Sequence, residues 1–382
     1  MISPGTNGAP AQKTKESNAA DRRFMDLALT LGRRGLGRTH PNPAVGAVVV
    51  KDGVIVGRGW TQPGGRPHAE PVALKQAGGA ARGATLYVTL EPCSHLGKSP
   101  PCADAIVAAG IARVVSAIED PNPEVAGQGH AKLRNAGIEV DVGLMAEEAA
   151  RAHAGHFRRI RDRRPHVIMK LAVSTDDRIA GHGHKTVAIT GEAANARIHL
   201  LRSQCDAILV GIGTVLADDP LLTCRLPGME ARSPVRIVLD RALRIPAKSR
   251  LVHSARSTPL WVMSSELAEA PATAILGANG AQVIRLGSRS QGGLDLSEVV
   301  HVLAERGITR LLVEGGSRVA SSFVAAGLAD EFWLLRGAGP IGADGVAALD
   351  AMPLSAITQS SAFRVHASES MGKDTLTIYE RS

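Results

Sequence analysis

Residues 85–102 read TLYVTLEPCSHLGKSPPC, an apolar strand pattern that runs directly into two cysteines, and a His-Ala-Glu triplet begins upstream at His68. A histidine and two thiolates are ligands that zinc accepts, and three ligands leave the fourth tetrahedral position open, as in catalytic zinc sites. The sequence therefore predicts a zinc site formed by His68, Cys93 and Cys102. Glu70 completes the triplet and is the candidate acid/base beside the metal.

This set of residues is typical of zinc-dependent deaminases, in which a glutamate outside the metal shell carries protons. The usual cysteine pair is Cys-x-x-Cys, whereas here the eight residues SHLGKSPP separate the two cysteines. His95 lies in that loop and is the one candidate for a fourth ligand, so a closed structural zinc site stays the alternative. Cys205 and Cys224 are interpreted as small buried apolar groups.

Short elements alternate around this motif. A helix is predicted from Asp21 to the glycines near Gly35, followed by strands Val45–Val50 and Val54–Val56 that a turn joins. Alternating strands and helices indicate an α/β domain with helices against a central sheet. The later elements predicted in this half are a helix from about His68, a strand Thr85–Leu90, a helix Ala103–Ala109, a strand Arg113–Ile118 and a helix His130–Ala136.

A basic, helical stretch at 147–165, EEAARAHAGHFRRIRDRRP, separates two halves of the chain. A length of 382 residues exceeds what a single core usually supports, so two domains are expected. We predict an unstructured tail over 1–20, a first domain over 21–162 and a second over 163–382. The second half is another α/β domain, with strands predicted at 166–173, 207–210, 235–239, 260–263, 282–286 and 310–313, and helices at 192–202 and 296–306.

Composition narrows the class of protein. The apolar fraction of 44% and the charged fraction of 21% are ordinary for a globular protein. No apolar run approaches the about 20 residues that span a bilayer, and residues 1–20 lack the apolar segment of a secretory signal. We therefore expect a cytoplasmic protein without a membrane partner. The net charge of +8 suits nucleic acid and phosphorylated metabolites equally well.

Four segments of the first half match a known pattern: NPxVG at 42–46, HAE at 68–70, EPCSHLGKSPPC at 91–102, and DPNP at 120–123 with glycines at 127 and 129. They resemble the deaminase half of the bifunctional deaminase/reductase family of riboflavin biosynthesis, for which the lengthened loop between the cysteines is typical. The resemblance implies a cytidine-deaminase-like three-layer α/β fold and a diaminopyrimidinone substrate that bears a phosphoribosylamino group. It also implies that this substrate is bound by Asn42, His95, Lys98, Asp120 and Asn122.

Strand ends in the second half suggest a second site. The strands predicted at 207–210 and 311–313 each run into glycines, at Gly211 and Gly315. Glycines after a strand let backbone N–H groups approach a phosphate, and two such elements in one domain favour a dinucleotide. Lys170 lies near the end of another apolar strand, where a site is plausible in an α/β sheet.

Four segments here, KLAVS at 170–174, VLADDPLLTCR at 215–225, VRIVLD at 235–240 and LLVEGGS at 311–317, resemble the reductase half of the same family. The resemblance implies a dihydrofolate-reductase-like α/β fold, NADPH as cofactor, and hydride transfer that opens a ribose to a ribityl chain. The implied cofactor residues are Ala172, Thr214, Asp218, Gly316, Ser317, Arg318, Val319, Ala320, Ser321 and Ser322. The implied substrate residues are Lys170, Thr186, Arg202, Leu222, Arg225 and Glu314, of which the arginines suit a phosphate.

Two positions depart from the family pattern. Thr175-Asp176-Asp177 stands where the family usually has Leu-Asp-Gly, and Ala188 stands where a tryptophan commonly precedes Ile-Thr. Loss of an aromatic wall weakens packing against the cofactor or substrate unless a neighbour replaces it. We nevertheless expect an active reductase.

Two other functions agree with parts of the sequence. A nucleic-acid base deaminase would use the same metal ligands, but the first half has few aromatics for stacking a flipped base, and the second half would have no role. A non-catalytic zinc module fused to a nucleotide-sensing domain would make Glu70 a surface carboxylate. We expect instead an enzyme that acts on a small phosphorylated pyrimidine, binds no nucleic acid and forms a homo-oligomer.

Overall fold

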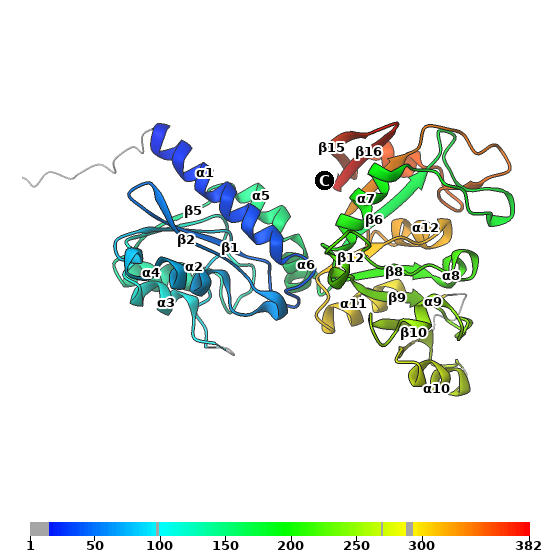
Figure 1. Ribbon diagram of the computed structural model, residues 1–382, viewed down its shortest axis with the longest axis horizontal. Coiled ribbons are helices and arrows are strands. Elements are labelled where there is room, and N and C mark those ends of the chain that lie inside the picture. Colours follow the sequence, from blue (N-terminus) through cyan, green and yellow to red (C-terminus); the bar gives the residue numbers. More distant parts are fainter. Residues whose placement is uncertain (1–14, 97–98, 269, 288–292) are drawn as a thin grey trace, which may run out of the picture. The chain divides into compact units, whose positions relative to one another are not determined.

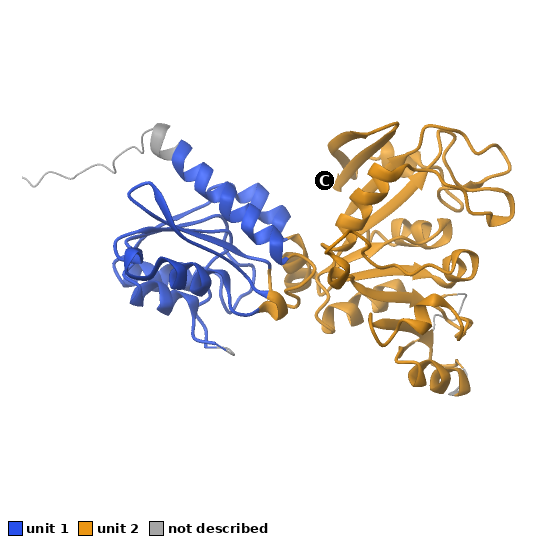
Figure 2. Ribbon diagram, in the orientation of Figure 1, with its two compact units in different colours: residues 1–35, 44–62, 66–153 blue, residues 36–43, 63–65, 154–382 orange. Residues whose placement is uncertain are grey.

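The computed structural model describes residues 15–96, 99–268, 270–287 and 293–382 (Figure 1). The chain divides into two units, which Figure 2 colours separately. Unit 1 comprises residues 1–35, 44–62 and 66–153, and unit 2 comprises residues 36–43, 63–65 and 154–382. Two short segments of the first half therefore belong to unit 2. The domain boundary after residue 162 stays a prediction.

Helix α1 (Lys15–Gly32) begins before Asp21, where the sequence predicts its start. Residues 15–20, KESNAA, were expected to belong to an unstructured tail, but they are helical. Lys, Glu and Ala have high helix propensity, so the helix extends into this stretch. The tail predicted for residues 1–14 lies outside the described residues.

The sheet of unit 1 has the strand order β2-β1-β3-β4-β5. Strand β1 pairs antiparallel with β2 and β3, and β3, β4 and β5 pair in parallel. The predicted hairpin is confirmed, and its turn places Asp52 and Gly53 at positive φ values of 51° and 77°. The strands span Gly46–Lys51 (β1), Val54–Trp60 (β2), Thr85–Val88 (β3), Arg113–Ser116 (β4) and Glu139–Val142 (β5), of which the sequence analysis missed β5.

Helices cover both faces of this sheet (Figure 1). Met25 and Leu29 of α1 pack with Val48 of β1 and with α5 (Ala146–Ala152) on one face. Helices α2 (Ala69–Ala77), α3 (Cys102–Ala108) and α4 (Gln128–Asn135) form the other layer. The result is the predicted three-layer α/β domain.

Glycines in β1 and β2 let the helices approach the sheet closely. A Cβ on Gly59 would lie 2.1 Å from the carbonyl oxygen of Ala69, and a Cβ on Gly46 would lie 1.8 Å from that of Ala28. A side chain at either position would therefore push its helix away from the sheet. Gly59 thereby sets the position of α2, whose first turn carries Glu70.

The sheet of unit 2 has the strand order β11-β10-β9-β8-β12-β6-β13-β16-β15. Neighbours from β11 to β13 pair in parallel, and β16 pairs antiparallel with β13 and β15. The predicted strands are confirmed; the sequence analysis missed the strands after residue 313 and the β7/β14 pair. The strands span His166–Val173 (β6), Arg178–Ala180 (β7), Ala207–Gly211 (β8), Val235–Leu239 (β9), Leu260–Ser265 (β10), Gln282–Leu286 (β11), Arg310–Val313 (β12), Glu331–Arg336 (β13), Val346–Ala347 (β14), Phe363–Met371 (β15) and Asp374–Arg381 (β16).

Two layers of helices enclose this sheet. One layer packs residues such as Ile198 and Leu251 against it and comprises α7 (Glu192–Arg202), α8 (Ile212–Asp218), α9 (Arg250–His253) and α10 (Ala270–Ala278). The opposite layer packs Val299 and Phe323 and comprises α11 (Leu296–Glu305) and α12 (Ser317–Ala325), with α13 (Ser355–Thr358) near its edge. Because β6, β8 and β12 are parallel, their carboxyl ends meet at one edge of the sheet.

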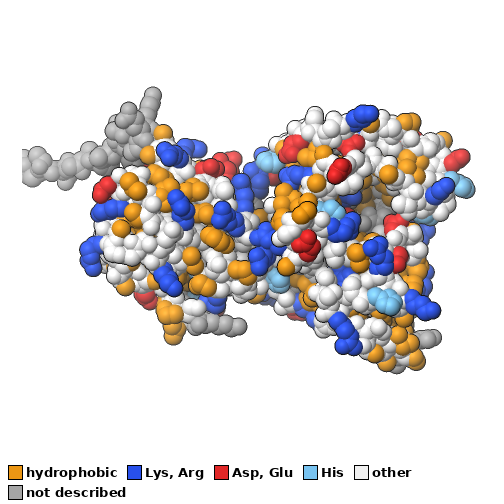
Figure 3. All heavy atoms as spheres, viewed as in Figure 1, with side chains coloured by type: hydrophobic (Ala, Val, Ile, Leu, Met, Phe, Trp, Pro, Cys, Tyr) orange, Lys and Arg blue, Asp and Glu red, His pale blue; other side chains and the backbone are white. Residues whose placement is uncertain are grey.

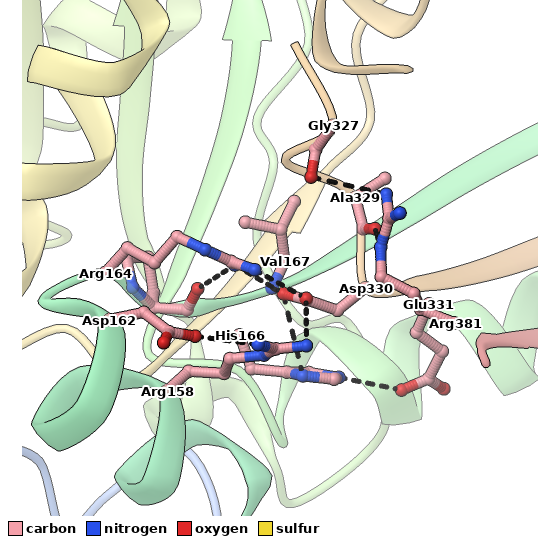
Figure 4. Close-up of polar contacts among 11 residues, drawn as sticks. Arg158, Asp162, Arg164, His166, Val167, Gly327, Ala329, Asp330, Glu331 and Arg381 are labelled. Atoms are coloured by element: carbon pink, nitrogen blue, oxygen red, sulfur yellow. Dashed lines mark hydrogen bonds and ion pairs between the residues drawn. The ribbon is translucent and has the colours of Figure 1, made fainter. Parts of the chain in front are cut away.

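A charge network fixes the start of β6 beside β13 (Figure 4). Arg164 donates two hydrogen bonds to the carboxylate of Asp330, at 2.6 and 2.7 Å, and Arg158 of α6 (Ala154–Asp162) lies 3.1 Å from the same group. His166 contacts Glu331 at 3.1 Å. Asp330 is only 3% exposed, so its charge requires these partners. The basic stretch before β6 is therefore bound to unit 2, in addition to being a charged helix.

The segment 36–43 is held in unit 2 by another buried carboxylate. Asp206 accepts hydrogen bonds from the backbone N–H and the hydroxyl of Thr309, at 2.8 and 2.7 Å. Nδ1 of His40 lies 3.4 Å from the other oxygen of Asp206. A hydrogen bond to Asp206 raises the pKa of His40.

No helix in the described part of the chain is long and apolar enough to cross a membrane. On the face shown in Figure 3, Lys and Arg side chains are spread over both units, with acidic side chains among them. The cytoplasmic location and the homo-oligomeric state stay predictions.

We expect Gly59→Ala to displace the start of α2 and to lower the free energy of unfolding by about 1–3 kcal/mol, the usual cost of overpacking an interior. The measurement is urea unfolding of the full chain, together with zinc bound per chain. Gly79→Ala is the control, since a Cβ there meets no atom within 4 Å. Equal stability and zinc content in all three proteins would show that Gly59 does not position the helix.

Candidate metal centre and reductase site

The three predicted metal ligands meet where helices α2 and α3 begin. His68 is the N-cap of α2, Cys102 is the first residue of α3, and Cys93 follows β3. Nδ1 of His68 lies 3.3 Å from Sγ of Cys102 and 3.7 Å from Sγ of Cys93. Tetrahedral bonds from zinc to a nitrogen and a sulfur put these two atoms about 3.5 Å apart. The residues present therefore fit a zinc ion.

This ligand group is open on one side. Among the described residues, no fourth His, Cys, Asp or Glu joins the three ligands. His95, the candidate for a closed structural site, is exposed and lies outside the group. The backbone N–H of Cys102 donates to Sγ of Cys93 over 3.3 Å, which helps to fix that sulfur. Three protein ligands with a free fourth position are the arrangement of a catalytic zinc site.

Burial controls the protonation of Glu70. Its side chain is 3% exposed, and this burial raises the pKa of the carboxyl to about 7. A carboxyl that titrates near neutral pH can both accept and donate a proton, which is what an acid/base group needs.

The contact between the two cysteine sulfurs shifts their pKa values in opposite directions. The hydrogen bond from Cys102 to the Cys93 sulfur, together with the contact to His68, lowers the pKa of Cys93 to about 4. The same hydrogen bond, with burial, raises the pKa of Cys102. The lowered pKa of Cys93 favours the thiolate form in which cysteine binds a cation.

Glu91 is a buried carboxylate to which the sequence analysis gave no role. Its carboxylate accepts four backbone hydrogen bonds, from the N–H groups of Gly127, Gly129, His130 and Asp120, at 3.0, 2.9, 3.2 and 3.2 Å. Three of these donors belong to the start of α4, so Glu91 caps that helix from a distant part of the chain. Because Glu91 precedes Cys93 closely, it also ties the loop at 119–127 to the metal centre.

The structure distributes the other predicted deaminase residues unevenly. Asp120 and Asn122 lie on the loop tied by Glu91, where their side chains accept the N–H groups of Asn122 and Glu124, at 2.9 and 3.1 Å. Asn42 lies on the segment that belongs to unit 2 and donates to the carbonyl of Gly65 over 2.7 Å. The prediction for Lys98 falls outside the described residues.

Glu314 organises the candidate site of unit 2. It follows β12 and accepts two hydrogen bonds from Arg202 of α7, at 2.7 and 2.8 Å, while Nζ of Lys170 lies 3.8 Å away. Burial alone would raise the pKa of Glu314, but the charge and hydrogen bonds of Arg202, with the charge of Lys170, lower it to about 2. Burial lowers the pKa of Lys170. All three residues were predicted to bind the same substrate, and the structure brings them together.

The predicted substrate residue Thr186 contacts a predicted cofactor residue, and two other predicted cofactor residues lie close together. Thr186 donates to Asp218 over 2.5 Å, and a Cβ on Gly316 would lie 3.8 Å from Oγ1 of Thr214. Gly316 is the N-cap of the nine-residue helix α12, and no side chain caps the helix there. The first N–H groups of such a helix are available to an anion. This turn therefore fits a cofactor phosphate.

Three other predicted cofactor residues of α12 are buried or hydrogen-bonded within unit 2, whereas the Arg318 side chain is exposed. Ala320 is fully buried in the core, Ser321 accepts the N–H of Asp350 at 2.7 Å, and Ser322 donates to the carbonyl of Arg318 at 2.8 Å. Within α12, the backbone of Ser317 to Val319 is thus the part available to a ligand. The half-buried Ala172 lies on β6, and Leu222 is buried with a positive φ of 56°.

The two departures from the family pattern have different structural consequences. Asp177, which stands where the family has glycine, has a φ of 60°, a conformation that glycine favours and Asp tolerates. Arg336 pairs with it at 2.7 Å. Ala188 is exposed. The chain therefore keeps the glycine-like turn while presenting only a methyl group at the tryptophan position.

The comparisons with known proteins cover both units. One family model, the cytidine and deoxycytidylate deaminase zinc-binding region, matches residues 18–118, and another, the RibD C-terminal domain, matches residues 165–377. The riboflavin biosynthesis protein RibD of Aquifex aeolicus is 41% identical over 361 residues, which cover 94% of this chain and 98% of that protein. The chain belongs to the RibD family. The Escherichia coli RibD is 43% identical and covers 81% of this chain and 86% of its own length.

Solved structures of RibD proteins extend the likeness to the whole fold. Acinetobacter baumannii RibD has a TM-score of 0.85 at 34% identity and covers 96% of this chain and 99% of its own. A diaminohydroxyphosphoribosylaminopyrimidine deaminase/5-amino-6-(5-phosphoribosylamino)uracil reductase from Thermotoga maritima has a TM-score of 0.84 at 37% identity, with the same coverage. The predicted fold class and the predicted pairing of a deaminase with a reductase in one riboflavin biosynthesis enzyme are confirmed.

RibD membership also decides between the functions that the sequence left open. A zinc-binding deaminase region and a RibD reductase domain imply Zn²⁺ and NADPH as cofactors, as predicted. Neither the nucleic-acid base deaminase nor the nucleotide-sensing module accounts for both halves of this RibD-family chain. The roles of individual residues stay predictions.

We expect Glu91→Gln to lower the free energy of unfolding by about 1–3 kcal/mol, because the amide turns one buried acceptor oxygen into a donor that faces N–H groups. Urea unfolding of the full chain measures the change. Glu124→Gln is the matched control, since Glu124 is exposed on the same loop. If both variants unfold like the parent protein, Glu91 does not hold the loop to α4.

Proposed function

We propose that unit 1 removes the 2-amino group of 2,5-diamino-6-(5-phosphoribosylamino)pyrimidin-4(3H)-one by hydrolysis, and that unit 2 reduces the ribosyl chain of the product, 5-amino-6-(5-phosphoribosylamino)uracil, to a ribityl chain. The observation that carries the proposal is the open group of His68, Cys93 and Cys102 at the start of the helix that carries buried Glu70. An enzyme of this kind needs a metal position open to water and a proton carrier next to it.

His68, Cys93 and Cys102 would hold the zinc ion, which when bound supplies Lewis acidity to activate water. Glu70 takes a proton from the attacking water and delivers it toward the ring nitrogen and the departing amine. Water adds to the carbon that bears the amine, the carbon–nitrogen bond breaks, and ammonia leaves. Burial supports this role, because it raises the pKa of the Glu70 carboxyl to about 7, close to neutral pH.

The loop that carries Asp120 and Asn122 would contact the substrate of unit 1. Glu91 ties this loop to the chain just before Cys93, so the loop and the metal ligands keep a fixed relation. Asn42, His95 and Lys98 are assigned to the same substrate by the family resemblance.

In unit 2, the N–H groups at the start of α12 and the Asp218 side chain would hold NADPH, whose chemistry when bound is hydride donation. Thr186, which donates to Asp218, would contact the substrate. The group formed by Lys170, Arg202 and Glu314 is rigid, because Glu314 binds both cations. We assign this group to the orientation of the ribosyl chain. The neighbouring Leu222 and Arg225 complete the substrate side of the site.

Glu70→Gln is expected to lower the rate of ammonia release by about 10²–10⁴-fold, since it removes a positioned acid/base group. Zinc content and NADPH oxidation with the deaminated substrate are expected to stay unchanged. Colorimetric ammonia release and metal analysis on the same preparation measure both properties. Persisting ammonia release with zinc still bound would show that another group carries the proton.

A coupled assay tests the two activities in order. With the diaminopyrimidinone substrate, ammonia release is expected with or without NADPH, whereas loss of NADPH absorbance is expected only after deamination. A chelator that removes zinc should stop ammonia release but leave NADPH oxidation with added deaminated substrate. Ammonia release without any NADPH oxidation would refute the reductase assignment.

A further inference from the structure

The phosphate of the reductase substrate requires a cation that is not already paired. Arg202 was the first candidate from the sequence, but its guanidinium is held by both oxygens of Glu314 and by the carbonyl of Thr223 at 3.1 Å. Arg202 is 12% exposed in its side chain, and its charge is balanced inside the site. A phosphate dianion therefore needs other partners.

Arg225 is the second candidate from the sequence, and its side chain forms no direct ion pair with a described carboxylate. Its backbone N–H donates to Nδ1 of His199 over 3.2 Å, which places it beside α7. Burial, followed by the nearby charges of Arg202 and Arg250, lowers the pKa of Arg225. Within the described part of the chain, no carboxylate pairs with the Arg225 side chain, because Glu314 is occupied by Arg202 and Lys170.

Arg250, which no sequence motif indicated, is anchored to the same segment. Its backbone N–H donates to the carboxylate of Asp219 over 2.8 Å. Asp219 starts the stretch that continues through Leu222 to Arg225. Arg250 is exposed, and no described carboxylate pairs with its side chain.

A buried arginine clamps α9, and thus Arg250, to this stretch. Arg236 of β9 is fully buried and donates from one nitrogen to the carbonyl of Leu221, at 3.3 Å, and to the hydroxyl of Ser254, at 2.7 Å. Its other nitrogen donates to the carbonyl of Thr258. The segment at 219–225 and the segment at 250–258 are thereby held against each other.

From this arrangement we propose that Arg225 and Arg250 form a phosphate clamp, which binds the phosphomonoester of the reductase substrate. Two guanidinium groups held on neighbouring segments, without acidic partners, match a dianion that accepts several hydrogen bonds. The Lys170, Arg202 and Glu314 group is left to the ribosyl chain. The inference rests on the proposed reductase function and adds Arg250 as a substrate-binding residue.

Arg250→Gln is expected to raise KM for 5-amino-6-(5-phosphoribosylamino)uracil by about tenfold or more, because a charge-assisted hydrogen bond is lost. The kcat should change little, since the phosphate is bound alike before and during the reaction. The KM for NADPH should stay the same. Calorimetry with ribose 5-phosphate gives a second readout: the variant should bind it at least about tenfold more weakly, and ribose alone should distinguish neither protein.

Arg241→Gln is the matched control. It removes the same charge from the loop between β9 and α9, where the Arg241 carbonyl accepts the N–H of Ser265 of β10 at 3.1 Å. This control should keep the parent KM for the uracil substrate. Unchanged ammonia release by unit 1 in each variant shows that the chain has folded.

Three results would overturn the clamp: an unchanged KM and ribose 5-phosphate affinity in Arg250→Gln, an equal effect of Arg241→Gln, or a rise in KM for NADPH alone. The last would place the 2′-phosphate of the cofactor at Arg250. If the parent protein oxidises no NADPH with the uracil substrate, the proposed reductase function fails, whereas ribose 5-phosphate binding still decides the clamp.

Discussion

The zinc centre depends on a distance constraint that only close packing can satisfy. Three ligand atoms must stay within a few ångströms of one another, yet they come from the start of α2, the start of α3 and the chain after β3. Glycine at position 59 allows α2 to lie against β2 with no side chain between them. Gly129 does the same where α4 meets the carbonyl of Pro92, since a Cβ there would lie 2.0 Å from that oxygen. The positions of His68 and Cys93 in the metal centre thus depend on two glycines, which carry no functional group.

Much of this organisation could be predicted, because ligand chemistry and strand patterns are local in the sequence. The metal ligands and Glu70 follow from residue types at short spacing. Strands β6, β9, β11 and β12 follow from short runs of mostly apolar residues, and their predicted bounds match the observed ones. Strand β15 was missed for a physical reason: FRVHASESM has mostly exposed positions at the sheet edge, so no apolar alternation marks it. Family resemblance named most of the reductase residues, which composition and spacing alone would not have found.

Residues that act through buried charge were the hardest to find. Glu91, Asp206 and Asp330 are almost fully buried, and each is stabilised by donors far away in the sequence. A lone acid after or before a strand has no local signature, since its partners are backbone N–H groups or arginines that only the fold brings near. The same holds for Arg250, whose place beside the segment at 219–225 depends on a buried arginine in β9. For these groups, the sequence shows the charged residue but not the partners that stabilise it.

Unit 2 is not continuous in the sequence, which matters for any attempt to prepare it alone. Residues 36–43 precede most of unit 1 in the sequence but belong to unit 2, where His40 faces Asp206. A single cut after residue 162 would leave the Asp206 carboxylate without the imidazole of His40. It would also separate residues 36–43, which contain no strand, from the rest of unit 2. A reductase domain that begins at residue 163 would therefore need another partner for the buried Asp206 carboxylate.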